Sequence, residues 1–186
     1  MLDTINSTSK IKELIANAPK PTAKKKKVIA SKFEVRQGSM AVCLMMTGDV
    51  VSATFFHSVL EIWVETEKKP VRLIDGEMLE CMFLTGEQLQ TLSGLTKKQI
   101  EGNARQKLKD FPFIKIGKGR ISPDNPNSYR IHLDQEAFWL EVAAILDPTK
   151  QIKTKDQGVE WVKKTVDRSK LPYVFKRLYA GVVKAE

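Results

Sequence analysis

Two helix starts of the same design, separated by one short turn, constrain this chain more than any other feature. In TGEQLQTLSGLTKKQ, the pattern Thr-x-x-Gln begins at Thr85 and again at Thr96. This spacing fits a capping box, in which the threonine hydroxyl and the glutamine amide each satisfy an unpaired backbone N–H. Gly94 lies between the two, and glycine favours the left-handed conformation that ends many helices. The pattern predicts helices over 86–92 and 97–109, joined by a tight turn.

The apolar residues of these two segments predict how they pack. We expect Leu89 and Leu92 on one buried face of the first helix. The second helix carries Ile100, Ala104 and Leu108 at four-residue spacing, which predicts a narrow buried stripe. Away from this stripe we expect a solvent-facing set, with Asn103 at its margin: Lys97, Lys98, Glu101, Gly102, Arg105, Gln106 and Lys109. Side chains of these types pair with base edges and phosphates of DNA.

Gly102 stands out in that set. It costs roughly 1 kcal/mol of helix propensity relative to alanine, so a compensating close approach of another backbone is expected, either from DNA or from a neighbouring helix.

A basic hairpin follows the second helix. Residues 113–116 are expected to form a strand, residues 117–127 a turn-rich tip, and residues 129–133 a returning strand with strict alternation. The Gly-Lys-Gly-Arg of the tip is not a phosphate-binding P-loop, because that motif opens a helix.

The segments before the two helices are less regular. Phe33 to Thr47 is rich in apolar, β-compatible residues, with a break at Gly38. Asp49 has the character of an N-cap for a long helix over about 49–66. VRLIDG and ECMFL are then candidates for short strands. His57, inside the long helix, is interpreted as a packed or surface residue rather than a metal ligand.

The order of these elements resembles that of a winged helix-turn-helix domain. The resemblance is carried by the sequences LTGEQLQTLSGLTKKQIEGNARQKLKDFPFIKIGKGR and NSYRI. The chain is similar to such domains in bacterial regulators and in the DnaD-like N-terminal domains of phage and plasmid replication proteins. The resemblance covers residues 48–134. It implies a mainly α fold with a small β-wing, a winged helix-turn-helix core followed by C-terminal helices.

The resemblance also implies which residues contact DNA. The recognition-helix positions are Lys97, Lys98, Gln99, Asn103, Arg105 and Gln106, and the wing-tip positions are Lys118 and Arg120. Thr96, Lys109, Lys115 and Arg130 from the same helix and wing complete the predicted DNA-binding set. Glu101 departs from the basic pattern, and either reads a cytosine amino group or lies outside the contact. Pro112 departs from the usual entry to the wing.

Three regions are expected along the chain. Residues 1–30 form a basic arm containing PKPTAKKKK, residues 31–147 the winged domain, and residues 148–186 a helical extension. The arm is interpreted as a solvated tail; added DNA affinity and a nuclear-localisation-like signal stay open.

The C-terminal region is expected to begin after a helix that Asp134 caps and Pro148 stops. A polar linker and two amphipathic helices follow, with apolar stripes Val159, Val162 and Val166, and Val174, Leu178 and Val182. These two helices are expected to touch DNA, to form a homodimer, or to do both.

Composition supports a polyanionic partner. The chain has 31 Lys and Arg against 22 Asp and Glu, a formal net charge of +9. Cys43 and Cys81 lie among apolar neighbours, which indicates buried free thiols. We expect no membrane association and a cytoplasmic protein, because no apolar run approaches the length of a bilayer span.

Known catalytic motifs are absent from the sequence, so we expect no enzyme activity, no metal and no cofactor. The predicted function is binding of double-stranded DNA in replication initiation or transcription regulation of a bacterial, phage or plasmid genome, with a possible protein partner from that machinery. The alternative is a protein-interaction adaptor, such as a replisome or polymerase-binding factor, that does not read DNA.

Overall fold

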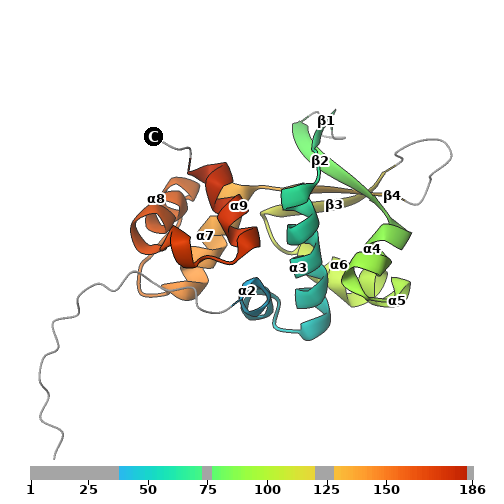
Figure 1. Ribbon diagram of the computed structural model, residues 1–186, viewed down its shortest axis with the longest axis horizontal. Coiled ribbons are helices and arrows are strands. Elements are labelled where there is room, and N and C mark those ends of the chain that lie inside the picture. Colours follow the sequence, from blue (N-terminus) through green and yellow to red (C-terminus); the bar gives the residue numbers. More distant parts are fainter. Residues whose placement is uncertain (1–37, 73–76, 120–127, 184–186) are drawn as a thin grey trace, which may run out of the picture. The chain divides into compact units, whose positions relative to one another are not determined.

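The computed structural model describes residues 38–72, 77–119 and 128–183. The chain divides after Ser31, and every described residue belongs to the second unit, Lys32–Glu186. This unit is mainly helical and contains one small antiparallel sheet (Figure 1). The expected basic arm and the hairpin tip at 120–127, including Arg120, lie outside the described residues.

The helices and strands follow one another closely along the chain. The first half contains α2 (Ser39–Thr47), α3 (Val50–Glu65), β1 (Lys69–Arg72), β2 (Met78–Thr85), α4 (Gly86–Ser93), α5 (Lys97–Gln99), η1 (Ile100–Ala104) and α6 (Arg105–Lys109). The second half contains β3 (Ile114–Gly119), β4 (Ser128–Leu133), α7 (Gln135–Leu146), α8 (Lys155–Thr165), η2 (Arg168–Lys170) and α9 (Tyr173–Val182).

The segment before Asp49 is helical where the structure describes it, and its β-compatible residues form no strand there. Gly38 is the N-cap of α2, and Gly48 ends the helix in the left-handed conformation. Val42, Cys43 and Met46 are buried at helical spacing against the rest of the core. Much of this segment consists of Ala, Leu and Met, which are good helix formers.

The long helix α3 begins as predicted. The Asp49 carboxylate accepts a hydrogen bond from the Ser52 N–H at 2.8 Å, which satisfies a donor at the helix start. Its buried face includes Phe55, Phe56 and Trp63. The helices α2, α4, α6 and α9 all pack against α3, which lies at the centre of the unit (Figure 1).

The sheet is antiparallel with strand order β1-β2-β4-β3. A strand is present at each of the two expected places before α4. The first, β1, begins two residues earlier than predicted and contains Pro70, and residues 73–76 of the predicted strand lie outside the described residues. The proline is tolerated because β1 is an edge strand. The hairpin strands are also present, and β3 extends to Gly119, three residues beyond the predicted Ile116. Gly119 pairs with Ser128, so the ladder continues toward the tip.

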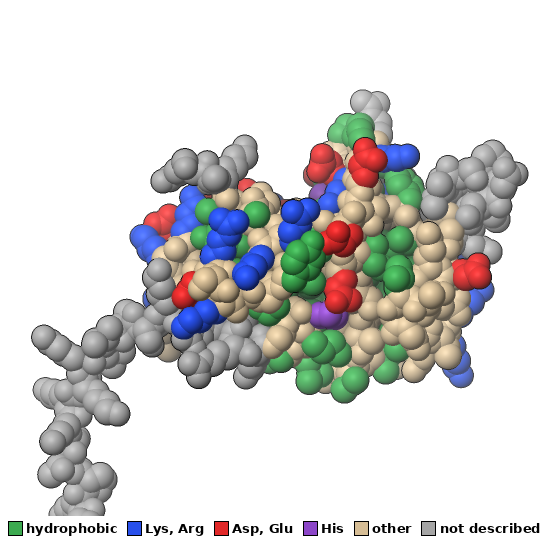
Figure 2. All heavy atoms as spheres, in the orientation of Figure 1, with side chains coloured by type: hydrophobic (Ala, Val, Ile, Leu, Met, Phe, Trp, Pro, Cys, Tyr) green, Lys and Arg blue, Asp and Glu red, His purple; other side chains and the backbone are tan. Residues whose placement is uncertain are grey.

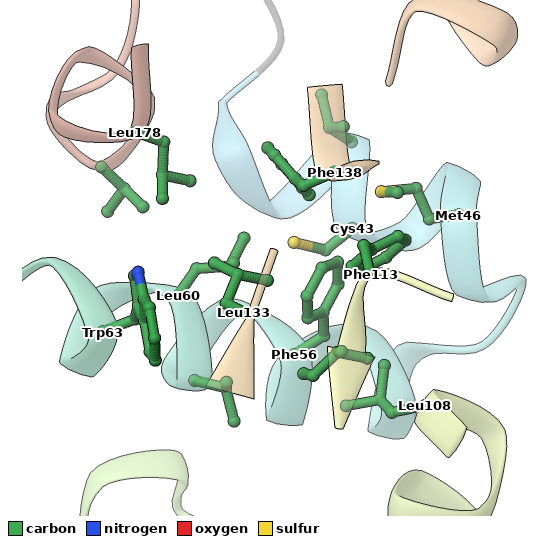
Figure 3. Close-up of a cluster of buried hydrophobic side chains, with 14 of the residues drawn as sticks. Cys43, Met46, Phe56, Leu60, Trp63, Leu108, Phe113, Leu133, Phe138 and Leu178 are labelled. Atoms are coloured by element: carbon green, nitrogen blue, oxygen red, sulfur yellow. The ribbon is translucent and has the colours of Figure 1, made fainter. Parts of the chain in front are cut away.

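One aromatic cluster links the elements of the unit. Phe138 of α7 lies with its ring centroid 6.1 Å from that of Phe56, 5.7 Å from that of Phe113 and 5.8 Å from that of Phe175. Figure 3 shows Phe56, Phe113 and Phe138 with Leu60 and Cys43 in this cluster. Burial raises the pKa of the Cys43 thiol, so it is a neutral core residue.

The C-terminal helices belong to the same core. Asp134 caps α7 as predicted, through a 3.0 Å hydrogen bond from the Ala137 N–H. Trp161 and Val162 of α8 and Phe175 and Leu178 of α9 are buried in the shared cluster. A third capping box begins at Thr154, within the segment expected to be a polar linker, and starts α8. The signal was the same Thr-x-x-Gln spacing.

Candidate nucleic-acid interface

The segment 97–109 is one continuous helical stretch with a wider turn inside it. Thr96 accepts a hydrogen bond from the Gln99 N–H at 3.3 Å, and Gln99 Oε1 accepts one from the Thr96 N–H at 2.9 Å. This confirms the second capping box, and the first is present at Thr85. Residues of η1 have π-helical hydrogen bonding, which the sequence analysis did not predict. Such π segments occur often at functional sites.

The predicted buried stripe is confirmed. Ile100, Ala104 and Leu108 are at most 2% exposed. The prediction that Leu89 and Leu92 share one buried face of α4 is wrong in part. Leu89 is fully buried, but Leu92 is 55% exposed. Leu92 lies in the last turn of a short helix, where its direction differs from that of Leu89 by about 60° at 100° per residue. Only the Leu89 direction meets α3.

The predicted DNA-binding residues of this helical stretch fall into three groups. Thr96 and Gln99 use their side chains in the cap. Lys97, Lys98, Asn103, Gln106 and Lys109 are exposed. Arg105 is half-buried, and its Nε has no hydrogen-bond partner among the described residues. The exposed group is the part available to a large partner.

Gly102 lies exposed within this group. A Cβ placed on Gly102 meets no heavy atom of the described residues within 4 Å. Its backbone conformation is helical rather than left-handed, so backbone strain does not require glycine there. The sequence predicts that this glycine allows the close approach of either DNA or a neighbouring helix. In the described part of the unit, no helix lies against Gly102. The free space above Gly102 faces solvent, beside Lys98 and Gln106.

A hydrogen bond joins the helical stretch to the hairpin. The Tyr129 hydroxyl of β4 donates to Glu101 Oε1 at 2.8 Å. This bond, with the nearby charges of Lys97 and Lys118, lowers the pKa of Glu101. Burial and the same bond raise the pKa of Tyr129 to about 12. Glu101 is therefore an ionised acceptor engaged within the unit.

Lys118 extends from the hairpin on the same side. It pairs with Tyr129 in the β3–β4 register, so the two side chains share a face of the sheet. Lys118, Lys97 and Glu101 line an open cleft of about 290 Å³ between α4, the start of the helical stretch and the hairpin. The full lining is Thr85, Gly86, Glu87, Gln90, Lys97, Ile100, Glu101, Lys118, Ser128 and Tyr129.

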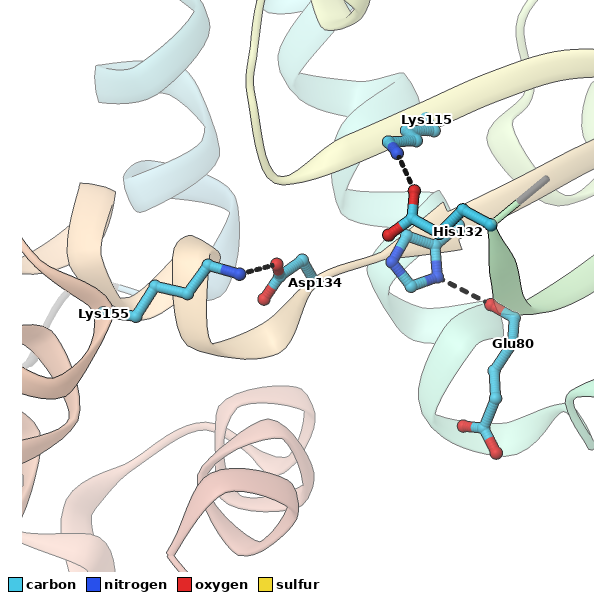
Figure 4. Close-up of polar contacts among 6 residues, drawn as sticks. Glu80, Lys115, His132, Asp134 and Lys155 are labelled. Atoms are coloured by element: carbon cyan, nitrogen blue, oxygen red, sulfur yellow. Dashed lines mark hydrogen bonds and ion pairs between the residues drawn. The ribbon is translucent and has the colours of Figure 1, made fainter. Parts of the chain in front are cut away.

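Two predicted residues lie on the other face of the sheet. Lys115 pairs with His132 and Gly117 with Arg130, alternating with the buried Ile114 and Ile116. Lys115 forms an ion pair with Glu77 at 2.8 Å, and His132 Nδ1 is hydrogen-bonded to the Glu80 carbonyl at 2.7 Å (Figure 4). The structure thus groups Lys118 with the helical stretch and separates Lys115 and Arg130 from it.

His57 makes polar contacts with two other side chains. Its Nε2 is hydrogen-bonded to Ser39 Oγ at 2.5 Å, and its Nδ1 lies 3.5 Å from Glu61 Oε2. Ser39 is only 7% exposed. It lines neither the 290 Å³ cleft nor a second cleft of about 170 Å³ beside Cys81 and His132. The arrangement joins α2 to α3 and supports packing, as expected for this histidine.

No group of three or more His, Cys, Asp or Glu side chains within residues 38–72, 77–119 and 128–183 is arranged to hold a metal ion. Over the same ranges, every helix is too short or too polar to cross a bilayer.

Comparisons with protein-family models, with curated proteins and with solved structures give no match to this chain.

Proposed function

We propose that the unit is a winged helix-turn-helix domain that binds double-stranded DNA through the helical stretch 97–109. The element order α3-β2-α4-α5/α6-β3-β4 and the sheet order β2-β4-β3 support this assignment. In such a domain the second helix of the pair enters the major groove and the hairpin lies beside it. We call residues 97–109 the recognition helix and β3–β4 the wing from here on.

The observation that carries the proposal is the exposed face around Gly102. Lys98, Gln106 and Lys109 offer donors for phosphates and base edges, and the glycine lets a DNA backbone approach the helix closely. Lys118 of the wing adds positive charge on the same side, near Lys97. Glu101 is engaged with Tyr129, which removes it from base reading.

The biological role follows from the resemblance alone. We propose replication initiation or transcription regulation of a bacterial, phage or plasmid genome, in the cytoplasm and without enzyme activity. We also propose that the chain forms a homodimer, because two copies reading two half-sites raise both affinity and specificity.

The test is fluorescence anisotropy with a random duplex at several salt concentrations. Lys98→Ala with Gln106→Ala is expected to weaken binding by about 1–3 kcal/mol and to flatten the salt dependence, because one phosphate or base contact is lost at each position. Lys69→Ala with Lys153→Ala is the matched control, since both lysines are exposed and lie on β1 and in the α7–α8 connection. Unchanged affinity in a folded Lys98/Gln106 variant would refute the recognition helix.

The adaptor alternative rests on a different observation. Leu44, Met45 and Val50 are 40%, 44% and 64% exposed at the junction of α2 and α3. Such neighbouring apolar side chains are typical of protein interaction sites. An adaptor would lose its partner on Met45→Ser with Val50→Ser and retain it after the recognition-helix changes. The mass of the same variant in analytical ultracentrifugation shows whether the partner is a second copy.

A further inference from the structure

The C-terminal helices carry a basic surface of their own. It is formed by Lys163, Arg168, Lys176 and Arg177, from the end of α8, from η2 and from α9. Three of these side chains are exposed and Lys176 is half-buried. Figure 2 shows Lys and Arg side chains gathered over α8 and α9. We call these four residues the C-terminal basic surface.

Two acidic residues near this surface are engaged with groups outside it. Glu160 pairs with Lys164 at 2.6 Å, and Asp167 accepts a hydrogen bond from the Ser169 N–H at 3.0 Å. Within the described ranges, the four cations of the surface form no ion pair. Burial lowers the pKa of Lys68, and the positive charge of Arg177 acts in the same direction. Glu80 and Glu65 act in the opposite direction on Lys68, so acidic and basic side chains both lie where α9 meets the end of α3.

The apolar faces of α8 and α9 are buried within the unit. Trp161 and Val162 of α8 and Val174, Phe175 and Leu178 of α9 are buried within the unit. The outward side is thus defined by its charge. A surface of Lys and Arg side chains that form no ion pair with the described residues fits a polyanion, and the phosphodiester backbone of DNA is the polyanion that the proposed function supplies.

The C-terminal basic surface is separate from the recognition helix. In Figure 1, α8 and α9 lie at one end of the unit and α5 and α6 at the other, with α3 between them. Glu61 and Glu65 are exposed on α3, and Figure 2 shows acidic side chains along this helix. An acidic stripe between two basic surfaces disfavours one duplex running across both.

We propose that the C-terminal basic surface binds the backbone of a second segment of duplex DNA, so that one chain holds two segments together. This rests on the proposed function for the first segment. The contact is sequence-independent, because phosphate contacts carry no direct base information.

The experiment is a two-duplex capture assay with the full chain. A random duplex is fixed on beads, the protein is added, unbound protein is washed away, and retention of a second, fluorescent random duplex is measured. Three charge-reversal pairs are compared: Arg168→Glu with Arg177→Glu, Lys98→Glu with Lys109→Glu, and the control Lys69→Glu with Lys153→Glu. Binding to a single duplex is measured in parallel by anisotropy.

We expect the Arg168/Arg177 variant to keep wild-type affinity for a single duplex within about twofold and to lose about tenfold or more of the captured second duplex. The control pair is expected to keep both. Capture that survives in the Arg168/Arg177 variant would overturn the proposal, and would assign bridging to two recognition helices of a dimer. Single-duplex binding with no capture by the wild type would overturn it as well.

The two proposals fail in different ways. If the Lys98/Lys109 variant binds a single duplex normally and the Arg168/Arg177 variant does not, the recognition helix is refuted and the C-terminal basic surface stands as the DNA site. If the wild type binds no duplex at low salt, both proposals are refuted.

Discussion

The hydroxyl of Tyr129 on β4 donates a 2.8 Å hydrogen bond to the carboxylate of Glu101, and this bond fixes the hairpin against the helical stretch 97–109. Tyr129 is 5% exposed, so its ring is anchored in the core while its hydroxyl reaches the helix. Lys118, its partner across the hairpin, is placed by the same strand pair. This hydrogen bond thus adds to the strand pairing and the shared core in fixing the proposed wing relative to the proposed recognition helix.

Tyr129→Phe tests this contribution. We expect DNA affinity to fall by about threefold to tenfold, the loss of about one hydrogen bond, because the wing is no longer held at one angle to the helix. Tyr173→Phe is the control, since it removes a similar 2.6 Å bond to Glu65. Equal affinity of the two variants, measured by anisotropy, would show that the Tyr129–Glu101 bond does not position the wing.

Two helical glycines are expected to respond in opposite ways to alanine. A Cβ on Gly158 of α8 would lie 2.7 Å from the Leu140 Cα, and both atoms belong to packed helices. Gly158→Ala is therefore expected to destabilise the unit by about 1–3 kcal/mol in urea unfolding. Gly102→Ala has free space and is expected to stabilise by up to about 1 kcal/mol.

Gly102→Ala also bears on binding. If a DNA backbone approaches Gly102 closely, the variant binds duplex more weakly although it is at least as stable as the wild type. A Gly102→Ala protein with unchanged affinity would leave the glycine without a role in DNA contact. Measuring stability and affinity on the same preparation separates the two effects.

Acid is expected to loosen the α7–α8 connection. Hydrogen bonds from Thr149 at 2.7 Å and Trp161 at 3.1 Å, and the Lys150 ammonium at 3.0 Å, lower the pKa of Asp147 to about 2. The folded-state pKa is lower than the unfolded value of 3.8, so protonation favours the unfolded chain. The stabilising contribution is complete above pH 4 and is lost as the pH falls from about 4 to about 2.

Asp147→Asn is the variant that checks this. Its melting temperature is expected to be below that of the wild type at pH 6, with the difference shrinking toward pH 2. Thermal unfolding followed by tryptophan fluorescence gives the melting temperature of the wild type and of the variant. Trp161 itself reports the contact with Asp147. A difference that stays constant from pH 6 to pH 2 would contradict the role assigned to the carboxylate charge.

Removing the C-terminal helices is expected to unfold the unit rather than to free a smaller domain. Phe138 and Trp139 contact Phe175 with ring centroids 5.8 and 5.7 Å apart, and truncation after Pro148 exposes both rings. Each large apolar side chain that returns to water costs about 1.5–3 kcal/mol. Loss of cooperative unfolding by circular dichroism is the expected result, and a truncated chain that melts cooperatively would show that the chain up to Pro148 folds without α8 and α9.

The sequence by itself determined where most elements begin. The caps at Asp49, Thr85, Thr96 and Asp134 all form as predicted, since each depends on a side chain and a backbone N–H three residues away. Gly94 ends α4 in the left-handed conformation for the same local reason. Interactions this short in sequence are independent of the rest of the fold.

Only the tertiary structure decided which faces those elements present. Leu92 is exposed because the core meets α4 along Leu89. Lys115 lies across the sheet from Lys118, because the pairing register of β3 with β4 assigns alternate residues to opposite faces. The stripes of α8 and α9 are covered by α7 and α3 rather than left for a partner. These outcomes depend on contacts between residues far apart in the chain, which local spacing does not encode.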